Sequence, residues 1–293
     1  MNRAIDHVTR HLAEPLPLEE VARVACFSPY HFHRIFRALV GETLHAFVKR
    51  VRLERALFLI SHGEGTSLTD VALRCGFASS SDFSRAFRAH YGMPPSVFDV
   101  DGFRRARRDE MVETLAPDDR HRLARLHAGA NPDGFAVELR RVPPRRVAYT
   151  RVMAPYQAGR VTAAAATMVA WARARGLAGG QWLGYQWDDP EIVALEQCRY
   201  DIGVEISNEA RVDGDVNTVV LPAMTLAEIA IAGPIELELR AFDWLYTTWL
   251  PQSGYAPDHQ PLFEAWNGEP FAHGDAHFEL RIQLAVVDEA APR

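Results

Sequence analysis

Hydrophobic positions in the first hundred residues recur at helical spacing, and the pattern occurs twice. The segment 18–27, LEEVARVACF, aligns with 68–77, LTDVALRCGF, at an offset of 50 residues, and 32–41, FHRIFRALVG, aligns with 83–92, FSRAFRAHYG, at an offset of 51. Within each copy the apolar residues fall three or four positions apart on either side of a short turn. Each copy therefore predicts a helix, a tight turn and a second helix, which is a helix-turn-helix unit.

The residues that flank the second helices support this interpretation. Ser28 followed by Pro29 fits an N-cap and a first helical position, and Ser79 or Ser80 can cap the equivalent helix of the second copy. Between the copies, residues 44–61 predict a further amphipathic helix, whose length at 1.5 Å per residue is roughly 27 Å. Such a helix can hold two recognition helices about one DNA turn, roughly 34 Å, apart, so one chain can reach two successive major grooves of double-stranded DNA.

Polar side chains off the apolar stripes of the second helices are the candidates for reading bases. They are Tyr30, His33, Arg34 and Arg37 in the first copy, and Ser80, Ser81, Ser84 and Arg85, with Arg88, in the second. Arginine binds guanine O6 and N7 with two hydrogen bonds, whereas serine accepts several bases, which predicts a more selective first half-site. The phenylalanines Phe32, Phe36, Phe83 and Phe87 are expected in the core. In the connecting helix, Arg50, Arg52 and Arg55 either bind phosphates or form a solvated basic face.

Residues 1–105 resemble the DNA-binding domain of AraC/XylS-type transcription regulators. The resemblance rests on SPYHFHRIFRALVG at 28–41 and GFASSSDFSRAFRAHYGMPPSVF at 76–98. It implies an all-α double helix-turn-helix domain in which Tyr30, His33 and Arg34 read one half-site and the second copy, through Ser80, Ser81, Ser84 and Arg85, reads the other. RNA polymerase is a further candidate partner of such a regulator.

The pattern changes after this domain. Residues 106–134 are rich in charge and end in GANPDG, which predicts a linker with a helix over 109–127. Alternating apolar residues at 137–142 and 147–152 then predict half-buried strands. The remaining segments predict helices over 160–175 and 236–250 and strands over 182–185, 200–206, 218–232 and 276–287. Residues 135–293 are therefore expected to form an α+β domain built from a duplicated strand-helix-strand-strand unit.

This second part resembles the GyrI-like (SbmC-type) effector-binding domain. The resemblance rests on CRYDIGVEI at 198–206, AFDWLYTTWLPQSGY at 241–255 and PLFEAW at 261–266. It implies a cleft between two halves, with aromatic walls and a buried glutamate at the position of Glu264, where Trp266 replaces a tyrosine that is common in the family. The expected ligand-binding residues are Glu264, Trp266, Trp187, Tyr185, Tyr149 and Trp249.

A carboxylate among aromatic rings attracts a lipophilic or aromatic cation by charge and by cation–π contact. This chemistry predicts a small-molecule effector of that class for the second domain. The alternative for each aromatic residue is a place in the hydrophobic core, where Trp and Tyr side chains contribute large buried areas.

The distribution of charge and cysteine agrees with a two-domain regulator. The net charge is −6, but residues 1–110 hold 16 Arg and Lys against 13 Asp and Glu, while the remaining residues hold 16 against 25. A basic domain joined to an acidic one suits DNA contact by the first alone. Three scattered cysteines predict neither disulfide nor metal site. The absence of a signal sequence or long apolar stretch predicts a cytoplasmic protein with no membrane partner.

The sequence thus predicts a transcription regulator controlled by a small ligand, with no cofactor and no catalytic residues. Nucleophile elbows, phosphate loops and dinucleotide fingerprints are lacking. An alternative is suggested by the second resemblance, because some isolated GyrI-like domains resemble hydrolases of reactive toxins that position water with a glutamate and a tyrosine. A protein partner such as gyrase is suggested only by the name of the related family.

Overall fold

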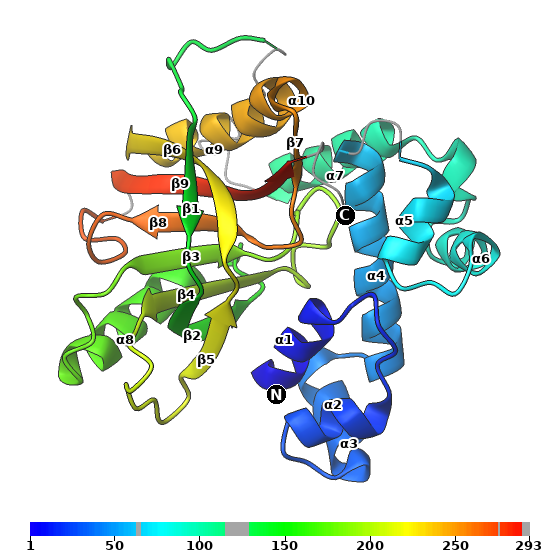
Figure 1. Ribbon diagram of the computed structural model, residues 1–293, viewed down its shortest axis with the longest axis horizontal. Coiled ribbons are helices and arrows are strands. Elements are labelled where there is room, and N and C mark those ends of the chain that lie inside the picture. The colour runs from blue at the N-terminus through cyan, green and yellow to red at the C-terminus, as the bar shows by residue number, and fades with distance from the viewer. Residues whose placement is uncertain (63–65, 115–128, 275, 289–293) are drawn as a thin grey trace. The chain divides into compact units, whose positions relative to one another are not determined.

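The computed structural model describes residues 1–62, 66–114, 129–274 and 276–288, and the chain divides into two compact units, Met1–Arg105 and Ala106–Arg293 (Figure 1). The first unit is all-α and the second is strand-rich with helices, as the sequence predicts. Within the described ranges, none of the helices is both long and apolar enough to cross a membrane.

The first unit consists of two helix-turn-helix pairs joined by a long helix. Its elements are α1 (Asn2–Arg10), α2 (Leu18–Val24), α3 (Pro29–Val40), α4 (Leu44–His62), α5 (Leu68–Arg74), α6 (Ser80–Tyr91) and the 3₁₀ turn η1 (Pro95–Val97). The pairs α2–α3 and α5–α6 match the predicted repeat. The predicted core is also confirmed, because Phe32, Phe36, Phe83 and Phe87 are fully buried.

Helix α1 was not predicted, although its sequence carries the signal. Ala4, Ile5 and Val8 are buried on one helical face, and together with Leu12 just after the helix they join the core of the first helix-turn-helix pair.

Matching caps delimit the two recognition helices α3 and α6. The Ser28 hydroxyl accepts from the backbone N–H of His31 at 3.4 Å, and the Ser79 hydroxyl accepts from that of Asp82 at 3.1 Å. Gly41 and Gly92 end the helices in the left-handed conformation, at φ 84° and 83°. The sequence repeat is therefore also a repeat of the capping structure, with Ser79 rather than Ser80 as the second N-cap.

Helix α7 (Val100–Thr114) crosses the boundary between the two units. Its Phe103 ring packs on Tyr91 and Phe98 in the first unit, at centroid distances of 5.6 and 5.4 Å. The beginning of the predicted linker is therefore helical. The predicted helix over 109–127 coincides with the end of α7, and its part from residue 115 lies outside the described residues.

One antiparallel sheet forms the centre of the second unit. Its strands are β1 (Glu138–Val142), β2 (Arg145–Met153), β3 (Trp182–Gln186), β4 (Arg199–Glu205), β5 (Asn217–Leu221), β6 (Met224–Gly233), β7 (Tyr255–Pro257), β8 (Leu262–Trp266) and β9 (Phe278–Asp288). They follow the order β1-β6-β9-β8-β3-β4-β2-β5, with β7 paired to β9 (Figure 1). Strands β7 and β8 were not predicted.

Two short connections make this sheet curl. Strand β1 ends at Val142 and β2 begins at Arg145, although the two lie near opposite ends of the strand order. Three residue steps span at most about 11 Å, so the ends of the sheet must approach each other. The connection from Leu221 to Met224 imposes the same restraint. The sheet therefore has an inner, concave face and an outer face.

Helices cover the outer face. Helix α8 (Arg160–Ala174) packs on β2 and β4, and α9 (Ile235–Trp244) packs on β6 and β9. The predicted helix over 236–250 is interrupted, because α9 runs into the π-helical turn η3 (Leu245–Trp249) and then α10 (Leu250–Ser253). Pro251 explains the change of helix type, since its nitrogen cannot donate to the Thr247 carbonyl and its ring would clash with that oxygen in an α-helix.

Candidate functional site

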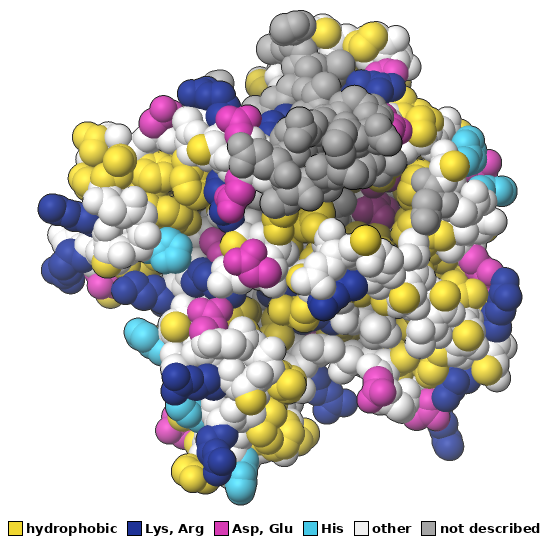
Figure 2. Space-filling model, turned by 180° about the vertical axis from the view of Figure 1, so that it is seen from behind, with side chains coloured by type: hydrophobic (Ala, Val, Ile, Leu, Met, Phe, Trp, Pro, Cys, Tyr) yellow, Lys and Arg dark blue, Asp and Glu magenta, His cyan; other side chains and the backbone are white. Residues whose placement is uncertain are grey.

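The first recognition helix, α3, exposes the four side chains predicted to read DNA. Tyr30, His33, Arg34 and Arg37 are all exposed. Tyr30 is 68% exposed, although its ring is largely apolar. The Arg34 guanidinium lies 5.9 Å from the centroid of the Tyr30 ring. Figure 2 shows Lys, Arg and His side chains on the surface of the helix-turn-helix unit.

The second recognition helix, α6, exposes only part of its predicted DNA-reading side chains. Ser81, Arg85 and Arg88 are exposed, while Ser80 and Ser84 are half-buried. The Arg85 guanidinium lies 3.7 Å from the Asp82 carboxylate one turn earlier. The sequence prediction did not include Asp82, whose carboxylate faces this arginine.

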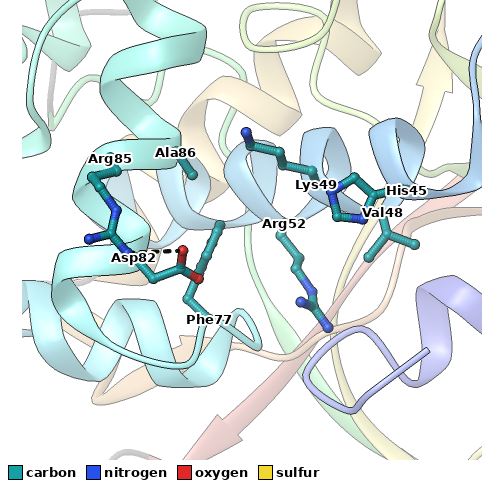
Figure 3. A pocket seen from close by; sticks show the side chains of 8 residues that line it. All are labelled: His45, Val48, Lys49, Arg52, Phe77, Asp82, Arg85 and Ala86. Carbon is teal, nitrogen blue, oxygen red and sulfur yellow. Dashed lines mark ion pairs between the residues drawn. The ribbon is translucent and has the colours of Figure 1, made fainter. Parts of the chain in front are cut away.

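A hollow between α4 and α6 lies beside this second recognition helix (Figure 3). Helix α4 and helix α6 supply most of its lining, and Phe77 from the α5–α6 turn completes it; the lining is His45, Val48, Lys49, Arg52, Phe77, Asp82, Arg85 and Ala86.

The sequence left two interpretations for the basic residues on α4, phosphate binding and a solvated basic face. Neither holds for Arg50 and Arg52, because both hydrogen-bond to groups inside the domain. Arg50 donates to Glu42 at 2.6 Å and to Glu54 at 2.8 Å. Arg52 donates to the backbone carbonyls of Leu12 and Glu14 at 2.9 and 2.7 Å. Arg50 thus joins α4 to the turn before it, and Arg52 joins α4 to the segment after α1. The Arg55 guanidinium lies 5.6 Å from the Phe58 ring centroid.

The contact between Arg52 and the segment after α1 leaves no space for a side chain at position 76, in the turn before α6, where the chain has Gly76. It has φ +79°, and a Cβ there would lie 2.6 Å from the Leu12 carbonyl oxygen and 2.9 Å from Arg52 Cζ. The aligned residue of the first turn is Cys26, at φ 61° and exposed. Only the second turn is thus closed to a side chain.

Replacing Gly76 by alanine is expected to lower the free energy of unfolding of the first domain by about 2–4 kcal/mol, from the left-handed backbone and the steric overlap together. Gly92→Ala is the matched control, because φ is +83° but the space around it is open; it should cost only about 1 kcal/mol. Far-UV circular dichroism during urea unfolding measures both. Equal losses would contradict the role given to the Arg52 contact.

The second unit buries a carboxyl group on the outer face of its sheet. Glu264 on β8 is 5% exposed, and its Oε1 accepts from the Gln186 side-chain amide at 2.9 Å. Its Oε2 accepts from the Tyr200 hydroxyl in a short hydrogen bond. Register explains the cluster, because Glu264 lies opposite Gly184 on β3, and Gln186 lies opposite Tyr200 on β4.

Gly184 leaves the space in which these side chains meet. A Cβ at this position would lie 2.7 Å from Glu264 Oε2 and closer still to the Tyr200 hydroxyl. The tyrosine–carboxylate contact therefore requires glycine on the strand between them.

A second carboxyl group reaches Glu264 from the covering helix. Glu238 on α9 is 2% exposed and is hydrogen-bonded to Glu264. Burial, and next the charge of Glu264, hold the pKa of Glu238 well above its ordinary value. Burial also raises the pKa of Glu264, against the opposing effect of hydrogen bonds from Tyr200, Gln186 and Glu238. Burial therefore favours the neutral form of both carboxyls.

The structure does not bring the six predicted ligand-binding residues together. Glu264 and Trp266 lie on the outer face, and half-buried Trp249 packs against the same core and stacks on Tyr255 at 6.2 Å. The other three, Tyr149, Tyr185 and Trp187, pack in the core of the inner face.

Trp187 on the inner face is already surrounded by cations of the protein itself. Its ring centroid lies 5.6 Å from the Arg151 guanidinium and 5.9 Å from that of Arg199, and its indole N–H donates to Asp201 at 2.7 Å. Arg151 in turn binds Asp201 at 2.7 Å. These aromatic residues thus take the core role that the sequence left as the alternative.

Three polar residues of the outer-face cluster were not predicted: Tyr200, Gln186 and Glu238. For Glu238 a signal exists, because it falls on the helical stripe that also carries the buried residues Ala241 and Leu245. A carboxyl on a buried stripe is a candidate for function. For Gln186 the signal is weaker, since only register places it beside Glu264. Within the described ranges, no group of three His, Cys, Asp or Glu side chains is arranged to hold a metal ion.

Two families match the chain. Residues 21–99 match the helix-turn-helix domain family, and residues 135–287, just over half of the chain, match the family described as the GyrI-like small molecule binding domain.

Individual relatives match one domain at a time. The probable transcriptional regulator LumQ of Photobacterium leiognathi is 37% identical over 93 residues, which are 32% of this chain and 37% of LumQ. The chain spans about a third of the length of the curated relatives it matches. A transcriptional regulator from Chromobacterium violaceum with an AraC-type DNA-binding domain aligns over 32% of this chain and 84% of its own, at 26% identity and TM-score 0.31. The EcmrR C-terminal domain aligns over 53% of this chain and 99% of its own, at 15% identity and TM-score 0.41.

Proposed function

This chain belongs to the GyrI-like small-molecule-binding family and carries an AraC-type helix-turn-helix domain at its N-terminus, and from that premise we propose that it is a transcription regulator whose DNA binding responds to a small cationic ligand. The ligand class rests on one observation, which is the set of neighbours around the buried Glu264 carboxyl. The proposed activity is binding without turnover.

Glu264 differs from five other buried carboxyls of the described residues in having uncharged or acidic partners. Its hydrogen bonds come from Gln186, Tyr200 and Glu238. Elsewhere buried carboxyls pair with arginine, as Asp201 with Arg151, Asp188 with Arg199, Glu228 with Arg140, Glu54 with Arg50 and Glu191 with Arg108. Buried charges in proteins are normally paired, and the described residues bring no cation to Glu264, so this site is suited to a cation that a ligand supplies.

Aromatic side chains around this core suit a cation that is also lipophilic. Trp266 lies in the same buried cluster as Tyr200, which donates to Glu264, and half-buried Phe242, Tyr246 and Trp249 pack against this cluster from the covering segment. That segment includes the π-helical turn η3, and such turns are frequent at functional sites. Because Glu264 is almost inaccessible, we propose that the ligand enters when the α9–α10 segment moves outward.

Paired probes of opposite charge test the ligand class. Tetraphenylphosphonium and tetraphenylborate have nearly the same shape, so a difference between them reports charge. We expect the cation alone to raise the melting temperature of the full chain, since a ligand that binds only the folded state stabilises it. Mass spectrometry should recover the cation unchanged. Stabilisation by the borate instead, or by both ions equally, would contradict the proposal.

DNA binding is assigned to the exposed faces of α3 and α6. We propose base contacts from Tyr30, His33, Arg34 and Arg37 in one major groove, and from Ser80, Ser81, Ser84 and Arg85 in the next. The exposure of the Tyr30 ring and the repeated capping structure support two equivalent recognition helices. One chain then suffices for two half-sites.

Lys49 is proposed to bind a phosphate where the DNA backbone passes α4. It faces the hollow beside Arg85, whereas Arg50 and Arg52 are engaged inside the domain. Lys49→Gln should weaken binding to specific and unrelated DNA equally and lower the slope of log K against log salt by about 1. Fluorescence anisotropy at four salt concentrations measures the slope. An unchanged slope would remove Lys49 from the interface.

We also infer that the second domain arose by duplication of a strand-helix-strand-strand unit. The runs β2-α8-β3-β4 and β6-α9-β8-β9 have the same order of elements, apart from η3, α10 and β7, which precede β8 in the second run. In the sheet, β6-β9-β8 and β3-β4-β2 mirror each other about the β8–β3 pair. This symmetry supports the inference, and it places Glu264 and Gly184 on the central pair of strands.

A further inference from the structure

The hydrogen-bonded carboxyls of Glu238 and Glu264 suggest how the ligand site adjusts to ligand charge. We propose that the pair keeps its shared proton when a monocation binds and gives it up when a dication binds, so that one site accepts both. This inference rests on the proposed function of the site and concerns its regulation.

The first step of the argument is that the two carboxyls hold one proton between them in the ligand-free protein. Both groups are at least 95% buried, and they are in direct hydrogen-bond contact. Two adjacent carboxylates in such surroundings do not both ionise near neutral pH, because like charges and burial each favour the neutral form. A carboxyl–carboxylate hydrogen bond also requires a proton on one of the two.

The proton resides on Glu238, because the surroundings favour charge on Glu264. Glu264 accepts hydrogen bonds from Gln186 on β3, from Tyr200 on β4 and from Glu238 itself. Hydrogen bonds to a carboxylate stabilise its charged form. Glu264 is the group that shifts the pKa of Glu238 beyond the effect of burial. The ligand-free pair thus carries one negative charge, and Glu238 donates to Glu264.

Among the described residues, the other titratable groups near the pair are tyrosines that stay protonated. Burial foremost, and then Glu264, raises the pKa of Tyr200 well above its ordinary value. Tyr156, in the connection from β2 to α8, is 42% exposed, and the neighbouring acidic groups Asp189, Asp188 and Glu264 favour its protonated form. The proton on Glu238 is therefore the one that the site can release at neutral pH.

The charge of the ligand decides what happens to that proton. A monocation neutralises the single charge of the pair, so the proton stays between the carboxyls. A dication leaves one positive charge uncompensated, and a nearby cation lowers the pKa of a carboxyl. Glu238 then transfers its proton to solvent, and two carboxylates face two positive charges. No bond other than this O–H bond changes.

Dication binding and monocation binding should depend on pH in different ways. While Glu238 is protonated in the free protein, each unit rise in pH should tighten dication binding by close to tenfold, and binding should become constant above its raised pKa. Monocation binding should be constant over the same range. It should weaken as pH falls through the pKa of Glu264, which burial raises, because the pair then becomes neutral.

Two planar probes of the same scaffold separate these cases: 1-methyl-4-phenylpyridinium, a monocation, and 1,1′-dimethyl-4,4′-bipyridinium, a dication. Neither titrates, so any proton comes from the protein. Calorimetry of the full chain in phosphate and in Tris, whose ionisation enthalpies differ, counts released protons. We expect about one for the dication and close to none for the monocation. In Glu238→Gln, a change of similar volume, we expect no release and a dication Kd at least tenfold higher, with the monocation Kd within about threefold.

Each contrary result has a distinct meaning. Binding of both probes without proton release overturns the inference and leaves the proposed function standing, as does failure of the dication alone. Failure of both probes contradicts the proposed function itself. Melting of Glu238→Gln at the wild-type temperature or above excludes misfolding as a cause of its result, and the calorimetric proton count on the wild-type chain does not depend on the variant.

Discussion

Replacing Glu264 by glutamine is expected to raise the Kd for a lipophilic cation by roughly 30-fold or more, which corresponds to at least about 2 kcal/mol. The physical reason is that the substitution keeps the volume of the side chain but removes the only charge that the neighbours Gln186 and Tyr200 stabilise. Glu238 does not replace that charge, because burial, the largest cause of its raised pKa, remains when Glu264 is replaced.

Tryptophan fluorescence measures this change directly. All six tryptophans lie in the second domain, and Trp266 shares a buried cluster with Tyr200, which donates to Glu264. The matched control is Tyr149→Phe, which alters an aromatic residue on the inner face of the sheet and should leave cation affinity unchanged. A loss of affinity in the control as large as that in Glu264→Gln would place the ligand on the inner face and contradict the assignment of the site.

Replacing Arg34 by alanine is expected to weaken binding to the specific operator by about 1–3 kcal/mol and to relax base preference at one position of the first half-site. The guanidinium is exposed on α3 and lies 5.9 Å from the exposed Tyr30 ring. It can therefore leave the protein surface without breaking an ion pair inside the domain, unlike Arg50, which is paired with Glu42 and Glu54.

An operator selected from random DNA and an unrelated duplex of equal length provide the comparison. Arg34→Ala should reduce affinity for the operator and leave affinity for the unrelated duplex within about twofold. Arg34→Lys serves as the control for charge, since lysine keeps the positive charge but loses the two-pronged hydrogen bonding to guanine; it should resemble Arg34→Ala. If both duplexes lose affinity equally, Arg34 contacts phosphate rather than a base.

The helical domain could be predicted almost entirely because its signals are local. The repeat, the capping serines and the apolar spacing all lie within segments of about 25 residues, and each agrees with the observed helices. Two features escaped prediction. Helix α1 has the same apolar spacing without a copy elsewhere in the chain, and the internal roles of Arg50 and Arg52 depend on partners as distant as Leu12.

The ligand site could be predicted only in part, because it depends on strand register. Alternation along β3 shows that Tyr185 and Trp187 share one face and that Gln186 belongs to the other. Whether Glu264 shares a face with Gln186 or with Tyr185 depends on the pairing of β3 with β8, which no local pattern specifies. The glutamate itself was identified by resemblance, while its separation from Tyr149, Tyr185 and Trp187 required the sheet.

The claim that one chain couples a ligand to DNA is tested most directly by measuring operator affinity of the full chain with and without saturating tetraphenylphosphonium, in the wild type and in Glu264→Gln. Coupled sites typically change each other's affinity by about 5–150-fold. We predict a change of that size in the wild type and less than twofold in the variant at the same cation concentration. Cation binding, established by fluorescence, that leaves operator affinity unchanged in the wild type would contradict the account.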